Sequence, residues 1–129
     1  MSAMSDFLEN KILDHICATT SYTAPSAVYL GLSTGDFTDT GSGASELSGS
    51  NYSRKAVVFD AAASGATSNT SNVDFDPASG NWGSISHWGL FDAAASGNIL
   101  LSGSFSSAKT IETNDVLRIS SGDLDLTAA

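Results

Sequence analysis

The sequence predicts a mainly β protein, an antiparallel β-sandwich or jelly-roll-like single domain with one N-terminal amphipathic helix. About seven or eight short segments are rich in alternating apolar, β-branched and aromatic residues, and Gly, Ser, Asn and Asp separate them. One segment near the start instead repeats its apolar residues at helical spacing. Because 129 residues suit one domain, we expect a single unit over 1–129, with a helical segment in 1–20 and a β core in 27–127.

The expected helix runs from Phe7 to Cys17. Asp6 is its predicted N-cap, and Glu9 is the predicted reciprocal partner in a capping box. Because a helix of this length is marginal in isolation, its apolar stripe must pack on the chain's own sheet or on a neighbouring molecule. Cys17 has no partner for a disulfide, and we expect it to be a small buried side chain. The residues of the stripe are Leu8, Ile12 and Ile16, with Leu13 and Cys17 beside them.

The β core is expected to begin after Pro25, which forbids a continuing helix. The segment Trp82–Phe91 carries apolar residues on both faces, which predicts a central strand. Residues 34–51 are rich in Gly, Ser, Thr and Asp, which indicates a long surface loop of the kind that is often functional. The expected strands are Ala27–Ser33, Tyr52–Ala61, Val73–Phe75, Trp82–Phe91, Asn98–Phe105, Lys109–Glu112, Val116–Ile119 and Leu124–Leu126.

One seven-residue sequence occurs twice, at Phe59–Gly65 and at Phe91–Gly97. Both copies read Phe-Asp-Ala-Ala-Ala-Ser-Gly, and each follows the end of an expected strand. Two copies are too few for a repeat protein, because a solenoid needs at least about three stacked units. We therefore expect the same turn chemistry to be used twice.

The charge balance is strongly acidic, with 14 Asp and Glu against 5 Lys and Arg and a formal net charge of -9. Only Arg54 and Lys55 are adjacent basic residues, so no basic patch is available for a phosphate backbone and we expect no nucleic-acid partner. The chain has neither an apolar run long enough to span a bilayer nor a recognisable signal segment, so we expect no membrane partner either.

The sequence offers little for catalysis. Its two histidines are His15 and His87, and Ser84 and His87 lie three residues apart on an expected strand, so they should face opposite sides. One cysteine and two distant histidines do not make a zinc site. We therefore expect no enzyme and no cofactor.

Two acidic pairs are spaced for one side of an extended chain, Asp74 with Asp76 and Asp123 with Asp125. A loosely held calcium ion is physically possible there. Neither pair continues into the spaced oxygen ligands and glycine of a calcium loop, so we expect a solvated acidic face.

Aromatic residues suggest a second kind of site. A carbohydrate platform could use Trp82, Trp88, Tyr29 and Tyr52, since sugars stack their apolar faces on aromatic rings. In an alternating β pattern, however, most such side chains belong to the core or to a subunit interface. Sugar binding is therefore retained only as a tail-fibre variant of a structural role.

Several segments together resemble a family of small tailed-phage virion proteins, which are often labelled tail-fibre or hypothetical structural proteins. The resemblance extends through nearly the whole chain, and no catalytic residues come with it. It implies a compact β domain with an N-terminal helical segment, used in many symmetric copies. The segments are Ser5–His15, Tyr22–Pro25, Val28–Thr34, Tyr52–Arg54, Trp82-Gly83, His87–Asp92, Lys109–Ile111 and Gly122–Leu124.

From this resemblance we expect a non-enzymatic structural protein of the bacteriophage virion, assembled in the host cytoplasm. A capsid decoration or cement protein that stabilises the shell is favoured by the short length and the absence of fibre repeats. The alternative is a tail-fibre or baseplate component that binds a host surface glycan or receptor. Expected partners are other virion proteins, either the major capsid protein or tail and baseplate proteins, and further copies in a homo-oligomer such as a trimer. The candidate interface residues are Phe7, Leu8, Ile12, Ile16, Phe37, Leu47, Trp82 and Trp88.

Overall fold

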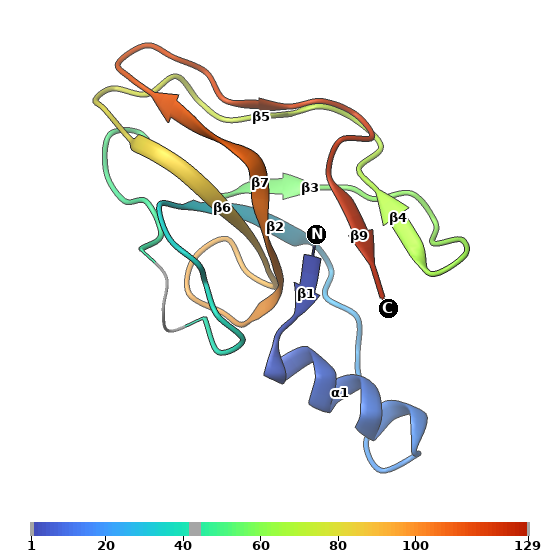
Figure 1. Cartoon of the computed structure of the whole chain (residues 1–129). Helices are drawn as coiled ribbons and strands as arrows, with labels where there is room; N and C mark the ends of the chain where they lie inside the picture. The colour runs from blue at the N-terminus through green and yellow to red at the C-terminus, as the bar shows by residue number, and fades with distance from the viewer. Residues whose placement is uncertain (1, 42–44, 129) are drawn as a thin grey trace.

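Figure 1 shows the protein as a computed structural model, which describes residues 2–41 and 45–128. The predicted mainly β, antiparallel architecture with one N-terminal helix is confirmed. The elements in these residues are β1 (Ser2–Met4), α1 (Asp6–Ile16), β2 (Val28–Ser33), β3 (Lys55–Val57), β4 (Ala66–Ser68), β5 (Val73–Asp74), β6 (Gly83–Phe91), β7 (Ile99–Ile111), β8 (Arg118–Ile119) and β9 (Asp125–Thr127).

A five-stranded antiparallel sheet with the order β1-β7-β6-β2-β3 is the main layer. The central position predicted for the Trp82–Phe91 segment is confirmed, because β6 lies between β7 and β2. Its register pairs Leu90 with Leu30 on one side and with Leu101 on the other. An apolar residue on this central strand thus meets apolar neighbours across both ladders. The stretch is apolar on both faces because Trp88 and Leu90 pack in the main core and Phe91 packs in a second buried cluster.

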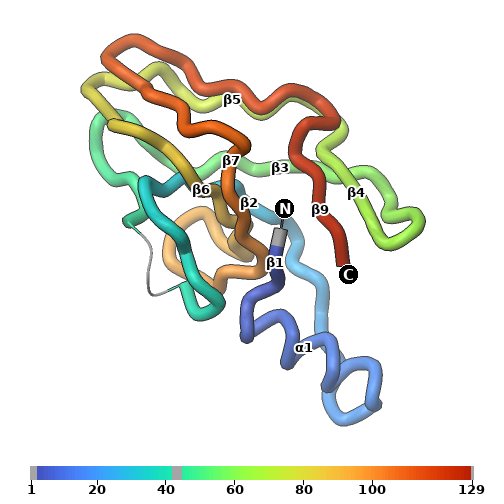
Figure 2. The backbone as a smooth tube through the Cα atoms, in the orientation of Figure 1, coloured from blue at the N-terminus to red at the C-terminus, as the bar shows by residue number. Residues whose placement is uncertain are grey.

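The second layer consists of two separate two-stranded ribbons, β4-β9 and β5-β8. In the view of Figures 1 and 2 they run along the upper and right-hand sides of the main sheet. The sheet contributes Leu30, Trp88 and Leu90 to a shared core, and the ribbons and their flanking segments contribute residues such as Val73 and Ile119. The main core therefore lies between the sheet and the ribbons.

Several strand boundaries differ from the sequence-based prediction. β1 and β4 were not expected, and only Lys55–Val57 of the expected second strand is extended. β7 is one long strand where two were predicted, since Phe105 to Ala108 form a bulge between the pairs His87–Ser104 and Ile85–Lys109. The polar Ser-Ser-Ala sequence there resembles a turn, but an irregular ladder keeps it extended.

The two copies of the repeated seven-residue sequence share two residues with positive φ but close differently. Ala63 and Ala66 exchange backbone hydrogen bonds in the first copy, whereas the Asp92 N–H donates to the Asn98 carbonyl in the second. Ser64 and Gly65 have φ angles of 52° and 76°, and Ser96 and Gly97 have φ angles of 56° and 74°. Two successive residues with positive φ match the twist of antiparallel strands, and glycine takes the second position without steric cost.

The predicted helix is present, but its N-cap is Ser5 rather than Asp6. The Ser5 Oγ accepts a hydrogen bond from the Leu8 backbone N–H at 3.2 Å, and the Ser5 hydroxyl donates to the Ile99 carbonyl at 2.6 Å. The prediction failed because β1 holds Ser5 in an extended conformation at the edge of β7, which only the fold reveals. The predicted burial of Cys17 is also wrong, since this residue is exposed just beyond the helix.

Candidate functional site

The apolar stripe of α1 divides between the chain's own body and its surface. Leu8 is buried where the helix begins beside β7, and Ile12 is half-buried. Leu13 and Ile16, in the second half of the helix, have 59% and 71% of their surface exposed. Figure 1 shows why, because α1 projects away from the sheet and only its first turns adjoin β1 and β7.

The loop 34–51 is anchored to the chain's own body. Phe37 is buried in a small cluster with Phe91 and Ile99, on the face of the sheet opposite the ribbons, and its ring meets Phe91 edge-on at 5.6 Å. Leu47 is half-buried against the main core. Residues 42–44 of this loop lie outside the described residues.

A buried ion pair fixes the second half of the same loop. The Arg54 guanidinium donates to both carboxylate oxygens of Glu46, from Nε at 2.8 Å and from Nη2 at 2.7 Å. The Tyr52 hydroxyl donates to Glu46 at 2.8 Å and accepts from the Leu32 N–H at 2.9 Å. Burial raises the pKa of Tyr52 far above its usual range, and the Glu46 carboxylate raises it further. Sequence reasoning noted Arg54 only as the basic neighbour of Lys55 and missed this cluster.

The two tryptophans proposed for an interface or a sugar platform belong to the core. Trp82 is 6% exposed and Trp88 is 4% exposed. Trp82 packs edge-on against Tyr52 and Phe75, and its indole N–H donates to the Ser50 carbonyl at 2.9 Å. Both indoles are therefore largely enclosed, although Trp88 also contributes to the wall of a pocket.

The Ser84 and His87 pair is replaced by a different contact. The Ser86 Oγ lies 2.7 Å from the His87 Nδ1, and the Ser86 hydroxyl also lies 3.0 Å from the Thr34 carbonyl that it can donate to. Within residues 2–41 and 45–128, no carboxylate is hydrogen-bonded to the His87 ring. The contact fixes the imidazole beside β2 and lacks the third group that orients a catalytic base.

The two acidic pairs have different environments. Asp74 pairs with Arg118 at 2.6 Å, and Asp76 pairs with Lys55 at 2.8 Å. The hydrogen bond from Arg118 lowers the pKa of Asp74. No group of three or more potential metal ligands occurs in the described part of the chain, so Asp123 and Asp125 are better understood through the pocket that they line.

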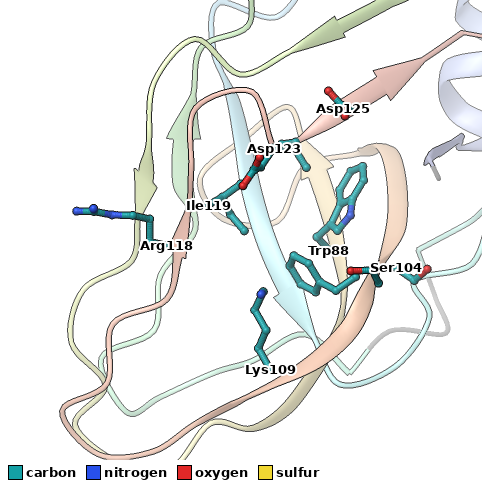
Figure 3. Close-up of a pocket in the computed structure, with 10 residues that line it drawn as sticks. Trp88, Ser104, Lys109, Arg118, Ile119, Asp123 and Asp125 are labelled. Carbon is teal, nitrogen blue, oxygen red and sulfur yellow. The ribbon is translucent and has the colours of Figure 1, made fainter.

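That pocket, with a volume of about 350 Å³, separates the bulged part of β7 from the β8–β9 segment (Figure 3). Lys109 reaches into it from β7, and Asp123 lies across from Lys109. Arg118 points away from the pocket, consistent with its pairing to Asp74. The lining combines apolar and polar side chains: Trp88, Phe105, Ile119, Leu124, Ser104, Ser106, Lys109, Arg118, Asp123 and Asp125.

The fold and these sites define a small antiparallel β domain with an exposed apolar helix end and one mixed-charge pocket, and no helix in the described ranges is long and apolar enough to cross a membrane. The chain belongs to the family described as Podophage GP4 fiber I protein gp80, whose model matches residues 3–127. The predicted resemblance to tailed-phage virion proteins is thereby confirmed, and the chain is a phage structural protein and a virion component. No curated protein matches it.

Proposed function

We propose that this protein is a non-enzymatic subunit of a phage tail fibre that binds other virion proteins. The observation that carries the proposal is the match of a fibre-protein family over residues 3–127, which is nearly the whole chain. The capsid decoration role favoured by the sequence finds no counterpart in that description, so the fibre alternative is the one advanced here. The structural character of the family also supports a role without catalysis.

The exposed end of α1 is the proposed contact surface, and its proposed occupant is a second copy of this chain. Each copy carries a formal charge of -9, so contacts between copies through their acidic surfaces would be repulsive. The side chains of Leu13 and Ile16 carry no charge and are largely exposed, so their burial between copies adds apolar burial that offsets part of that repulsion. Phe7 and Ile12 flank this surface as half-buried residues of the predicted interface.

Labelling of purified phage particles tests the fibre assignment. Gold-conjugated antibody against this protein should mark fibres at the tail in electron micrographs. Label spread over the head would support the capsid decoration alternative and refute the fibre assignment. Absence of the protein from particles by mass spectrometry would refute both.

A double variant tests the contact surface. Leu13→Asp together with Ile16→Asp should leave the isolated domain folded, because both side chains are exposed, and should reduce self-association in sedimentation velocity. The matched control is Val58→Asp, at another exposed apolar residue outside α1. Unchanged association of the double variant, or equal loss in the control, would reject α1 as the contact.

A further inference from the structure

We propose that the pocket between β7 and the β8–β9 segment binds a sugar unit of a bacterial surface glycan that carries no negative charge. The proposal rests on the fibre function only for the source of the sugar, because the pocket chemistry is independent of where the protein sits in the virion. A volume of about 350 Å³ lies at the small end of the usual range for ligand sites, roughly 300–1,000 Å³, and suits one or two sugar rings.

The charges in the pocket disfavour an anionic ligand. The three ion pairs of the described residues involve Arg54, Lys55 and Arg118, so the Lys109 ammonium and the carboxylates of Asp123 and Asp125 are not paired with protein charges. The two carboxylates outweigh the single ammonium, so the pocket repels an anionic ligand. A neutral ligand that offers many hydrogen bonds avoids this repulsion and can bond to groups of both signs.

The hydrogen-bonding groups match sugar hydroxyls. Ionised carboxylates only accept hydrogen bonds and an ammonium only donates them, whereas a hydroxyl does both. A sugar can therefore donate to Asp123 and Asp125 and accept from Lys109 in one pose. Ser104 and Ser106 add hydroxyls on the β7 side.

The remaining lining suits the C–H faces of a sugar ring. Phe105 is half-buried and contributes an aromatic surface, and Leu124 is buried beneath the acidic residues. The Lys109 ammonium lies 5.7 Å from the centroid of the Phe105 ring, so the cationic group and the aromatic surface are adjacent in one wall. An amphipathic ligand with polar edges and apolar faces is complementary to this arrangement.

The bulge in β7 is the structural feature that makes room for the pocket. Between Ser104 and Lys109 the strand departs from its regular ladder with β6, and both of these residues line the cavity. Bulges commonly redirect side chains next to binding sites. Here the bulge places Phe105 and Ser106 opposite the β8–β9 segment.

Nuclear magnetic resonance titration of the isotope-labelled full chain tests the inference. The probes are methyl glycosides of glucose, galactose and mannose, with methyl glucuronide as the anionic probe and methyl glucosaminide as the cationic one. At least one neutral glycoside should shift the amide signals of Ser104, Lys109 and Asp123 in a saturable way, and more strongly than methyl glucuronide. Shifts confined to other regions, no shifts with any neutral glycoside, or stronger binding of methyl glucuronide would overturn the proposal.

Variants test the assigned roles. Asp123→Ala and Asp125→Ala should each weaken binding about tenfold, because each removes a charged hydrogen-bond acceptor. Glu9→Ala removes an exposed carboxylate on the remote helix and should leave affinity unchanged. Lys109→Ala should shift the preference towards methyl glucosaminide. If Asp123→Ala fails to fold, Asp123→Asn serves in its place. Wild-type affinity in the variants at both Asp123 and Asp125 would refute the assignment.

The two proposals fail separately. Fibre labelling on particles without any sugar binding would overturn the pocket assignment and leave the fibre role intact. Saturable sugar binding together with gold label on the head would overturn the fibre role and leave the pocket assignment intact.

Discussion

The guanidinium carbon of Arg54 lies 3.5 Å from the centroid of the Phe91 ring. The same group pairs with Glu46 and donates from Nη1 to the carbonyls of Ala93 and Ser96, at 3.0 and 2.8 Å. One side chain thus joins the 34–51 loop to the second copy of the repeated turn. A planar guanidinium that stacks and forms a bidentate pair performs this task, and a lysine ammonium cannot reproduce it.

We expect Arg54→Met to lower the free energy of unfolding by about 3–5 kcal/mol, because it leaves the Glu46 carboxylate without its partner in a largely enclosed site. Urea denaturation followed by tryptophan fluorescence measures the change. Arg118→Met is the matched control, since its pair with Asp74 is exposed and should contribute little. Similar losses in the two variants would contradict the role given to Arg54.

Gly31 should not tolerate a larger side chain. An added Cβ would lie 2.8 Å from the Glu46 Oε2 and 3.0 Å from the Phe91 ring, both of which the Arg54 cluster holds in place. Gly31→Ala is expected to cost about 1–3 kcal/mol of stability. Gly35→Ala, where no atom lies within 4 Å of the added Cβ, is the control for thermal unfolding. A neutral Gly31→Ala would show that the cluster yields easily.

The burial of Tyr52 should make the free energy of unfolding fall at alkaline pH. Its pKa is raised in the folded state, chiefly by burial, so its contribution is fully present below the unfolded pKa near 10 and declines as the pH rises above that value. The decline approaches about 1.4 kcal/mol per pH unit. Tyr52→Phe should be less stable at pH 7, since the Leu32 N–H loses its acceptor, and its stability should fall less steeply between pH 10 and 11. If the free energy of unfolding falls equally steeply with pH in the wild type and in Tyr52→Phe, this effect of Tyr52 is rejected.

Substitutions along the apolar stripe of α1 should differ in their cost to stability, with a large cost at buried positions and a small one at exposed positions. Leu8→Ala is expected to cost about 2–5 kcal/mol because Leu8 is buried beside β7. Leu13→Ala in the same helix should change stability by no more than about 0.5 kcal/mol, because that side chain is exposed. Chemical denaturation of both variants decides the matter, and equal costs would mean that the whole stripe is packed in the isolated chain.

The sequence by itself determined the elements whose signal is local. The spacing of Leu8, Ile12 and Ile16 predicted the helix, and the apolar residues of Trp82–Phe91 predicted a central strand. The repeated Ser-Gly turns were also predictable, since positive φ depends on adjacent residues and their side chains. Local steric preference and periodicity suffice for such features.

Only the tertiary structure decided which side chains are buried and which meet. Sequence pattern marks Trp82 and Trp88 as large apolar residues, but burial against the ribbons depends on strands that pair across long separations. The contact of Arg54 with Phe91 and the placement of Lys109 across from Asp123 are likewise long-range. Such pairings are set by packing of the whole chain, and no local propensity encodes them.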